Sequence, residues 1–483
     1  MNTRPTNETT ASAYTAETIA PTVPTRSTEA GILLRIAVPL AAAYLAELAI
    51  SLTSKAIVGQ LGYRELAAIG LAADTATELV VVLVGLLSVV GVLVAQAEGA
   101  GTRAAAGVAA RQGLIVATVM GLAATLLVWH LDVLLAHTGQ DPEILALMAD
   151  FLGPLSLSML PVLWFFALRT FVAALAKTSA VMAITVSAVG LNYILAEGLV
   201  HGSYGLPALG VAGAGWAKTI VSFTMFFALL AYTYLTPTFR GYGLFRGRFK
   251  LDLTVCREIF RLGIPVMGIV ILEASLFFAV AIFSGQLGAV ALATYQVMIA
   301  WVGFAFVTAH GLAEAGMVRV AHGIGRGSMA SSRQSGLLTF AIGVVWLTLL
   351  IAVPLLSPEP IVRIFLDEND PGFAEVLTMV TQLLILAAFF QIFDGLQVMA
   401  ALALRGLKDT IAPLWFAGVG YWAFGIAGGW MLAFPLKMGA YGLWLGMAAG
   451  LTITGTLLAL RFAMLTSRDT EVQTSAVRQS GQE

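Results

Sequence analysis

Charged side chains are scarce in this 483-residue chain: Asp, Glu, Lys and Arg make up 11% of it, whereas 59% of the residues are hydrophobic. Soluble domains carry roughly 25% charged residues, so this composition argues against a soluble globular protein. The net charge of −1 leaves no basic surplus to neutralise phosphates, which argues against a nucleic-acid partner. The single cysteine, Cys256, excludes an internal disulfide and a cysteine-based zinc cluster.

Long apolar segments dominate the chain instead. A helix of about 20 residues crosses a bilayer core of about 30 Å. Twelve suitable segments cover residues 31–59, 65–97, 107–130, 144–173, 179–200, 210–236, 262–286, 290–321, 336–356, 373–403, 411–434 and 439–463. The sequence therefore predicts an all-α integral membrane protein with 12 transmembrane helices. Residues 1–29 are rich in Thr, Ser, Pro and Glu and lack an apolar run, so we predict a disordered cytoplasmic tail there.

Basic residues support this count because cytoplasmic loops accumulate Lys and Arg. With both termini inside, 21 of the 26 basic residues fall in inner segments or at inner span ends. Outer loops contain only Arg64, Arg363 and Lys437, while Lys55 and Lys218 lie within spans. We therefore predict a multi-pass protein of the plasma or inner membrane with both termini in the cytoplasm.

The two halves of the sequence repeat one another. Residues 35–62 align without a gap with residues 261–288, and both segments end in Gly-Gln-Leu-Gly. The predicted parts are an N-lobe (30–236), a basic cytoplasmic linker (237–260), a C-lobe (261–463) and a cytoplasmic tail (464–483). Each lobe has an even number of spans, so the repeats share one orientation about an axis along the membrane normal. Two such lobes enclose a central cleft, which is typical of secondary transporters.

Acidic residues lie within several predicted spans. An acid at the bilayer centre costs at least about 2.5 kcal/mol on insertion scales, so it usually faces the protein interior or water. Seven acids are placed in this way: Glu47, Asp74, Glu78, Glu197, Glu273, Glu314 and Asp394. Only Lys55, Lys218 and, if protonated, His310 oppose them. The interior is therefore predicted to be net acidic and to attract cations.

Glu273 and Asp394 are the deepest of these acids. Glu273 lies halfway along the seventh span with no basic neighbour one turn away, and Asp394 lies similarly deep in the tenth. Gln391, Asp394 and Gln397 follow three-residue spacing and form a polar stripe on an otherwise apolar helix. Because desolvation disfavours the charged form, both acids are predicted to carry protons near neutral pH. We assign Glu273, Asp394, Gln391 and Gln397 to a cation- or substrate-binding site.

The first two spans hold a second polar group. Glu47, Ser51 and Ser54 share one face of the first span, and Glu47 joins the predicted cation site because it aligns with Glu273 in the repeat. Lys55 is expected to pair with an acid of a neighbouring helix. Asp74 and Glu78, four residues apart, form a like-charge pair that favours protonation of one member.

The remaining acids in the spans are given structural roles. His310 and Glu314 are four residues apart and are expected to form a local ion pair within their helix. Glu197, near the outer end of its span, is also interpreted as structural.

Sequence motifs for ATP hydrolysis or covalent catalysis do not occur. The chain contains no Walker loop, nucleophile elbow or metal-ligand spacing. We predict no catalytic residue, no resident metal and no cofactor besides a coupling ion, H⁺ or Na⁺; Na⁺ would bind transiently at Glu273 and Asp394. Aromatic side chains near these carboxylates could stack on planar organic cations.

The motifs together resemble one transporter family. Arg261-Leu262-Gly263-Ile264-Pro265, Glu273, Gly285-Gln286-Leu287-Gly288, Ala293-Thr294-Tyr295-Gln296-Val297, Asp394 and Leu404-Arg405-Gly406-Leu407-Lys408-Asp409-Thr410 follow in order. The segment from Gly205 to Gly215 is similar to the family's loop between the fifth and sixth spans. Residues 30–463 thus resemble the multidrug and toxin extrusion (MATE) family, in its NorM-like branch.

The resemblance implies two pseudo-symmetric six-helix lobes around a V-shaped cleft. It also implies secondary active export of organic, often cationic, drugs or metabolites in exchange for Na⁺ or H⁺. Glu273 and Asp394 fall where the NorM-like branch has the acids of its C-lobe cation site, and Tyr295 lies in a matching motif, so we add it to the predicted site. The expected partners are a small organic cation and membrane lipid, with no nucleic acid and no obligate protein partner.

The first lobe departs from the family pattern. Ser54 and Lys55 stand where many members have an acid, and Ala196 follows the retained Asn192 where Asp or Asn is common. We group Asn192, Ser51, Ser54, Lys55, Asp74 and Glu78 as a candidate N-lobe polar site, and expect ion coupling to depend on the C-lobe.

Two other functions remain open from the sequence. A lipid-linked oligosaccharide flippase of the same superfamily would favour basic residues in the cleft, and the spans offer mainly Lys55 and Lys218. An integral membrane enzyme acting on lipid would need clustered acids or histidines at one membrane face, whereas the five histidines are scattered.

Overall fold

The computed structural model describes residues 24–137, 142–245, 250–366 and 371–480, with side chains up to residue 467, and is helical throughout these segments. The first lobe contains α1 (Arg26–Gly59), α2 (Tyr63–Gly99), α3 (Arg103–Trp129), α4 (Leu131–Ala136), α5 (Pro142–Ser156), α6 (Met159–Ala174), α7 (Ser179–His201), η1 (Ser203–Gly205), α8 (Val211–Leu235) and η2 (Pro237–Tyr242). The second contains α9 (Leu253–Gln286), α10 (Ala289–Gly325), α11 (Met329–Leu356), α12 (Glu359–Phe365), α13 (Phe373–Gly406), α14 (Ile411–Ala417), η3 (Gly418–Gly428), α15 (Gly429–Ala433) and α16 (Gly439–Ser480).

The predicted spans correspond to these helices. Eleven helical segments among the described residues are long and apolar enough to cross a membrane, and α5 with α6 supplies a twelfth if the bent pair forms one span. The pair bends by 44° at the break between Ser156 and Met159. Pro161 has no N–H to donate to the carbonyl of Leu157, so the helical hydrogen-bond ladder is interrupted at the bend.

The predicted ends of the lobes can now be compared with the helices. Of the proposed N-terminal tail, residues 1–23 lie outside the described residues, and α1 begins at Arg26. In the proposed linker, residues 237–242 form η2, and α9 begins at Leu253 because the Asp252 side chain caps it by accepting hydrogen bonds from the amides of Thr254 and Val255. The helix α16 continues through residue 480 of the proposed C-terminal tail.

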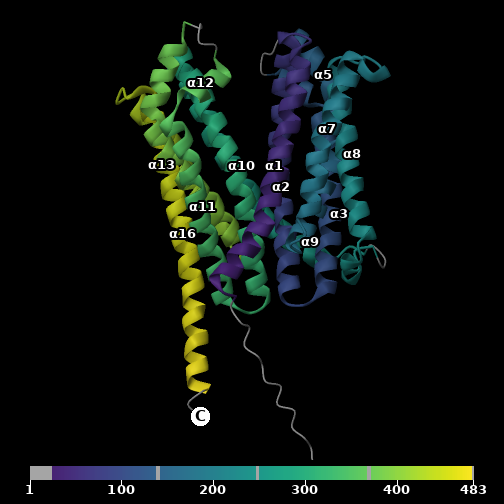
Figure 1. The fold of residues 1–483 in the computed structure, drawn as a ribbon, viewed down its shortest axis with the longest axis vertical. Coiled ribbons are helices and arrows are strands. Elements are labelled where there is room, and N and C mark those ends of the chain that lie inside the picture. The colour runs from purple at the N-terminus through teal and green to yellow at the C-terminus, as the bar shows by residue number, and fades with distance from the viewer. Residues whose placement is uncertain (1–23, 138–141, 246–249, 367–370, 481–483) are drawn as a thin grey trace, which may run out of the picture.

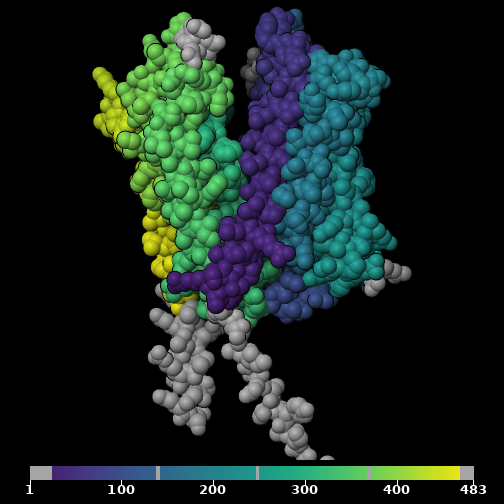
Figure 2. Space-filling model, viewed as in Figure 1, coloured from purple at the N-terminus to yellow at the C-terminus, as the bar shows by residue number. Residues whose placement is uncertain are grey.

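The helices form two lobes that diverge like the arms of a V. In Figure 1, the labelled helices between α1 and α8 make one arm, those from α10 to α16 make the other, and α9 is labelled at the closed end beside α3. The space-filling view shows a deep groove between the arms, open at the end opposite the chain termini (Figure 2). At the other end the lobes meet, and the first turns of α1 cross onto the C-lobe. This arrangement confirms the predicted all-α fold with two lobes and a central cleft.

Two glycines let the lobes touch by their backbones at the closed end. A Cβ atom on Gly99 would overlap the carbonyl oxygen of His322, and one on Gly325 would overlap the carbonyl oxygen of Gln96. Gly99 and Gly325 are mates in the sequence repeat, and so are Gln96 and His322. The two contacts are therefore one contact repeated about the pseudo-twofold axis, and α2 crosses α10 at that axis.

The loops at the closed end repeat the same backbone turns. Gly101 and Gly327 have φ angles of 72° and 70°. Ala176 and Lys408 also adopt positive φ, at 56° and 62°, although neither is glycine. Both follow the C-terminal end of a span in the aligned segments 174–178 and 406–410. Such left-handed residues are uncommon outside glycine, so their recurrence supports a structural duplication.

Candidate functional site

The polar stripe predicted on α13 is buried inside the C-lobe. Gln391, Asp394 and Gln397 are each no more than 2% exposed. Asp394 Oδ1, Gln397 Oε1 and both amide atoms of Gln391 have no hydrogen-bond partner among the described residues. Buried polar atoms are normally paired with protein groups or water, so this face of α13 is a candidate surface for a bound water, ion or substrate.

Glu273 reaches the same region from α9. Its side chain is half-buried, and none of the described residues forms an ion pair with it. The Glu273 carboxylate interacts electrostatically with Asp394 in its own lobe and with Glu78 of α2 across the cleft. Arg405 lies within electrostatic range, but its guanidinium donates a 2.8 Å hydrogen bond to Ser88 Oγ. The two predicted carboxylates thus lie within electrostatic range of one another.

Tyr295 lies beside this region, but its hydroxyl is already bound. The side chain is 4% exposed, and the hydroxyl donates a 2.9 Å hydrogen bond to the carbonyl oxygen of Phe277 on α9. Its ring packs near Trp444 of α16, with 6.2 Å between centroids. In this conformation the Tyr295 hydrogen bond links α10 to α9.

Glu47 has a partner that the sequence did not indicate. Arg169 of α6 is completely buried and donates to Glu47 Oε1 at 2.9 Å through Nη1. The basic-residue count placed Arg169 at an inner span end, but it lies within the packed helices. A lone arginine inside the apolar run 159–174 is a sequence signal for a buried partner, but it does not identify which acid that partner is.

Arg169 also reaches the other lobe. Its Nη2 donates to Glu314 Oε2 of α10 at 3.3 Å, and the Tyr44 hydroxyl of α1 donates to the same oxygen at 2.8 Å. The guanidinium carbon lies 4.1 Å from the centre of the Tyr44 ring, a cation–π distance. Two carboxylates from different lobes therefore share one buried guanidinium; we call Tyr44, Glu47, Arg169 and Glu314 the Arg169 cluster.

The partners of Glu314 correct one expectation. The predicted ion pair with His310 is absent from the described contacts, because Glu314 instead bonds to Tyr44 and Arg169, while His310 packs edge-on against the Tyr44 ring. Sequence spacing shows neighbours on one helix but not on facing helices. Glu197 pairs with His201 at 3.3 Å, in agreement with its structural role.

The candidate N-lobe polar residues form two separate contacts. Asn192 Nδ2 donates to Ser54 Oγ at 3.0 Å, joining α7 to α1. Lys55 pairs with Asp74 of α2 at 2.6 Å, which confirms the predicted pairing with a neighbouring helix. This ion pair also offsets the repulsion expected between Asp74 and Glu78. Ser51 is half-buried and Glu78 is exposed.

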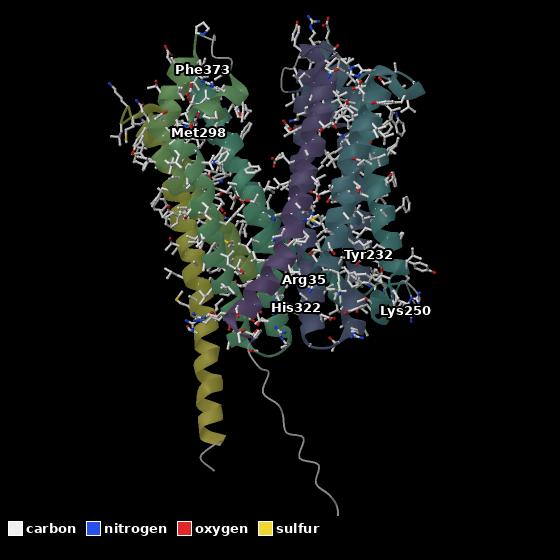
Figure 3. All side chains as sticks on the ribbon, viewed as in Figure 1. Arg35, Tyr232, Lys250, Met298, His322 and Phe373 are labelled. Carbon is white, nitrogen blue, oxygen red and sulfur yellow. The ribbon has the colours of Figure 1, made fainter. Side chains whose placement is uncertain are left out.

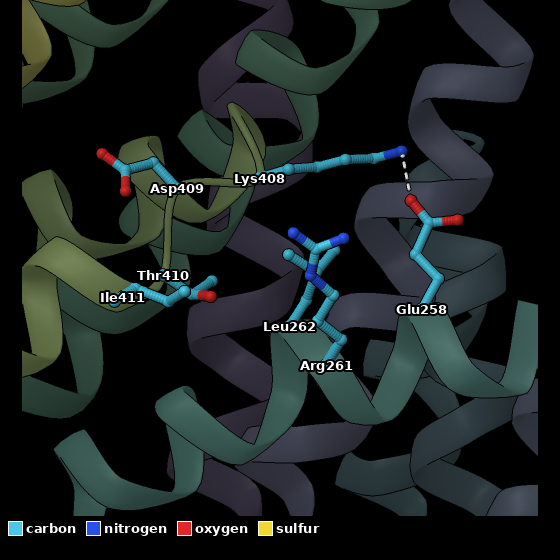
Figure 4. Close-up of a pocket in the computed structure, with 7 residues that line it drawn as sticks. All are labelled: Glu258, Arg261, Leu262, Lys408, Asp409, Thr410 and Ile411. Atoms are coloured by element: carbon cyan, nitrogen blue, oxygen red, sulfur yellow. Dashed lines mark hydrogen bonds and ion pairs between the residues drawn. The ribbon is translucent and has the colours of Figure 1, made fainter.

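A separate pocket of about 280 Å³ lies at the closed end. It is lined by Glu258, Arg261, Leu262, Lys408, Asp409, Thr410 and Ile411 (Figure 4). Lys408 Nζ donates to Glu258 Oε1 at 2.8 Å across it. Figure 3 marks this end by Arg35 and His322, and the open arm of the C-lobe by Met298 and Phe373. The pocket contains neither Glu273 nor Asp394.

Oxygen atoms supply the polar chemistry around Asp394. The described residues contain no group of three or more His, Cys, Asp or Glu side chains suited to holding a metal ion. A carboxylate and amide oxygens are, however, ligands that hard cations accept. The region can therefore accept a proton or a weakly held monovalent cation as a transported ion.

Comparisons with known proteins agree with this architecture. The MatE family model matches residues 39–196 and 265–431. The "Probable multidrug resistance protein NorM" of Pseudomonas putida is 36% identical over 444 residues, which cover 92% of this chain and 95% of that protein. The protein of the same description from Pseudomonas aeruginosa is 36% identical over 436 residues, covering 90% and 89%.

Solved structures share the fold. The crystal structure of the eukaryotic MATE transporter AtDTX14 matches with a TM-score of 0.81 at 23% identity, over 94% of this chain and 99% of that one. An outward-facing multidrug resistance MATE family transporter of the MOP superfamily matches with a TM-score of 0.82 at 16% identity, over 91% and 96%. With both lobes matched by the family model and relatives 36% identical over nine-tenths of its length, the chain belongs to the MATE family of membrane transporters.

Proposed function

We propose that this protein is a cation-coupled antiporter that exports organic, mainly cationic, compounds in exchange for H⁺ or Na⁺. The observation that supports the proposal is that Glu273 and Asp394 of the C-lobe lie within electrostatic range of one another and form no ion pair among the described residues. Unpaired acids within a membrane protein mark ion and substrate pathways. The relatives described as multidrug resistance proteins support the class of cargo.

Exchange follows from competition for the same charge. When a proton or Na⁺ neutralises one carboxylate, a cationic substrate loses the attraction that held it near the pair. Substrate binding in turn makes the carboxylates less available to the ion. This negative coupling between two binding events is reciprocal, so entry of the ion favours release of the substrate.

The orientation of the protein is part of the proposal. Because basic residues accumulate at the end where the lobes meet, that end faces the cytoplasm together with both termini. The groove in Figure 2 then opens to the outside. This conformation is the one that releases exported substrate and receives the driving ion.

The proposal is tested by neutralising the two acids. We expect Asp394→Asn and Glu273→Gln to reduce pH- or Na⁺-driven dye efflux from proteoliposomes at least about tenfold, since each removes a charge that both ligands need. The matched control is Glu375→Gln, which removes an exposed acid from the first turn of α13. Undiminished efflux in both site variants, with normal amounts of folded protein, would rule out this site.

The observed charges do not favour the alternative functions. A flippase for a lipid-linked pyrophosphate needs free basic groups, but Lys55 is paired with Asp74, and Lys218 lies in the field of Glu47. Translocation of a labelled lipid-linked sugar in the same proteoliposomes would separate this function from dye efflux. Membership of a transporter family decides against the membrane-enzyme interpretation.

A further inference from the structure

The pocket at the closed end has the position and size for a small ligand rather than for exported cargo. It lies between α9 and residues 408–411, at the start of α14. Its volume of about 280 Å³ falls below the roughly 300–1,000 Å³ of pockets for drug-sized ligands. Further along α9 the two helices touch, because Gly268 has no Cβ to keep the Leu414 side chain away. The pocket therefore has room for a compact polar group at one end of the spans.

The charges around the pocket leave one cation without a partner. Lys408 Nζ donates to Glu258 Oε1 at 2.8 Å. The Asp409 carboxylate accepts a 2.5 Å hydrogen bond from Arg461 Nε. Arg261 forms neither an ion pair nor a hydrogen bond with the described residues, and its guanidinium points into the pocket (Figure 4). Because the two ion pairs cancel, these five residues together carry one net positive charge.

A buried hydroxyl without a partner lines the same pocket. Thr410 is 3% exposed, and its hydroxyl forms no hydrogen bond with the described residues, although side chains buried to this extent are normally paired. Its repeat mate, Thr178, donates a 3.3 Å hydrogen bond to the carbonyl oxygen of Ile36 on α1. The residue equivalent to Ile36 in the C-lobe is Leu262, which lines the pocket. The same turn is thus bonded to its neighbouring helix in the N-lobe, whereas in the C-lobe it leaves a donor free beside a cavity.

The donors of the pocket match the oxygens of a phosphate group. A guanidinium binds two phosphate oxygens through parallel N–H groups, and a lysine ammonium has three donors, so it can bind a phosphate while it keeps its carboxylate. Arg261, Lys408 and Thr410 supply such a set from both sides of the pocket. A phosphodiester carries one negative charge and balances the site, whereas a phosphomonoester carries about −1.5 to −2. The charge therefore favours a diester.

Exposed apolar side chains beside the pocket provide a surface for acyl chains. Ile264 lies one turn beyond Arg261 on α9, and Ile411 and Trp415 lie one turn apart at the start of α14; all three are exposed. In the proposed orientation the pocket lies at the cytoplasmic leaflet, which contains anionic lipids, and basic pockets between spans on that side bind lipid headgroups. These observations favour a phospholipid over a soluble phosphate.

We propose that the pocket between α9 and α14 binds the headgroup phosphodiester of an anionic phospholipid, which Arg261, Lys408 and Thr410 hold at the cytoplasmic leaflet. The inference goes beyond the proposed antiport, because it uses the proposed orientation but none of the residues assigned to ion or substrate binding. A lipid bound here joins the start of α14 to α9 at the closed end.

The test measures binding of labelled phosphatidylglycerol, which carries one net negative charge, to the delipidated full-length protein in detergent. We expect Arg261→Gln to weaken binding at least about tenfold, because it removes the cation that has no partner among the described residues. Thr410→Val keeps the shape of the side chain but removes a donor to a charged acceptor, and it should weaken binding severalfold. Neither group loses a described protein contact, so both variants should unfold at the unmodified temperature without lipid.

The matched control is Arg35→Gln in the N-lobe. Arg35 is the repeat mate of Arg261 and is exposed on α1, where the Thr178 hydroxyl is already bonded to the neighbouring helix. We expect this variant to keep full affinity for phosphatidylglycerol. If Arg35→Gln weakened binding as much as Arg261→Gln, general surface charge would explain the effect and the pocket would not be the site.

Competition separates the two sources of phosphate. We expect phosphatidylcholine, which has a phosphodiester but no net charge, and inorganic phosphate to displace labelled phosphatidylglycerol poorly. Equal displacement by either competitor would overturn the assignment to an anionic lipid, and so would unchanged affinity in both Arg261→Gln and Thr410→Val. These results would leave the proposed antiport untouched, because it fails only if Asp394→Asn and Glu273→Gln leave efflux undiminished.

Discussion

Arg169 binds one carboxylate from each lobe, and Arg319 of α10 likewise pairs across the lobes with Glu29 of α1. Arg169 is fully buried between Glu47 of its own lobe and Glu314 of the other. The depth of both acids could be predicted from the sequence, because each lies well within an apolar span. Their common partner could not be predicted, because Arg169 is 122 positions from Glu47 and 145 positions from Glu314 in the chain. Contacts between facing helices depend on how the helices pack, which spacing along one helix does not reveal.

Loss of Arg169 is predicted to destabilise the protein. Arg169→Gln leaves Glu314 buried beside Tyr44 without a cation, and breaking a buried ion pair in this way costs about 3–5 kcal/mol. Thermal unfolding in detergent measures the effect. Arg363→Gln removes an exposed arginine paired with Glu359 and is expected to cost less than about 1 kcal/mol.

The double variant Arg169→Gln with Glu314→Gln checks the physical reason. Because it leaves no unpaired charge at the buried Glu314 position, we expect it to recover part of the lost stability. Equal destabilisation in the single and double variants would contradict a charge-based role for the Arg169 cluster.

At the scale of helices, the sequence predicts which segments form helices better than it predicts how those helices bend. The twelve apolar segments correspond to the observed spans, since length and hydropathy are local properties. The 44° bend between α5 and α6 and the π-helix in residues 418–428 were not predicted. The glycine-rich run at 418–429 looks like an ordinary span in sequence; its π-helical form appears together with its packing on the glycines of α16, an arrangement that is not local.

The crossing of α2 and α10 depends on the missing side chains of Gly99 and Gly325. Gly99→Ala and Gly325→Ala each place a methyl group on a carbonyl oxygen of the other helix. Overpacking of this kind typically costs about 1–3 kcal/mol, and we expect a lower thermal midpoint for both variants.

The same helices supply controls for these substitutions. A Cβ atom on Gly70 of α2 or Gly303 of α10 would meet nothing within 4 Å. Alanine has the higher helix propensity by about 1 kcal/mol, so Gly70→Ala and Gly303→Ala should be neutral or stabilising. If all four variants behaved alike, the close crossing would not be the cause.

For the whole molecule, the repeat and the basic residues predicted two lobes, and the groove between them is observed. The sequence could not predict which end of the groove is open, because both conformations of such a transporter contain the same helices. Likewise, the deep acids were recognised as candidates. The fully buried Tyr421 of η3 was not, since its place within electrostatic range of Glu273 and Asp394 depends on the assembled C-lobe.

The proposed orientation is tested with single introduced cysteines. Tyr63 at the start of α2 lies at the open end and is 78% exposed, while Leu253 at the start of α9 lies at the closed end and is 71% exposed. A membrane-impermeant thiol reagent should label Tyr63→Cys in intact cells and Leu253→Cys only in inverted vesicles. The native Cys256 is buried, so the unmodified protein is the background control. The reverse pattern would invert the assigned topology.

The reciprocal contacts of Gly99 and Gly325 limit which residues fit where the two halves cross. Gly99 lies against the backbone of His322, and Gly325 lies against the backbone of Gln96, which is the repeat mate of His322. At both positions main-chain atoms of α2 and α10 face one another directly. Neither half can acquire a side chain at this joint without pushing against the other half. Because the contact is made twice, once from each half, a rotation of one lobe against the other has to change both contacts together.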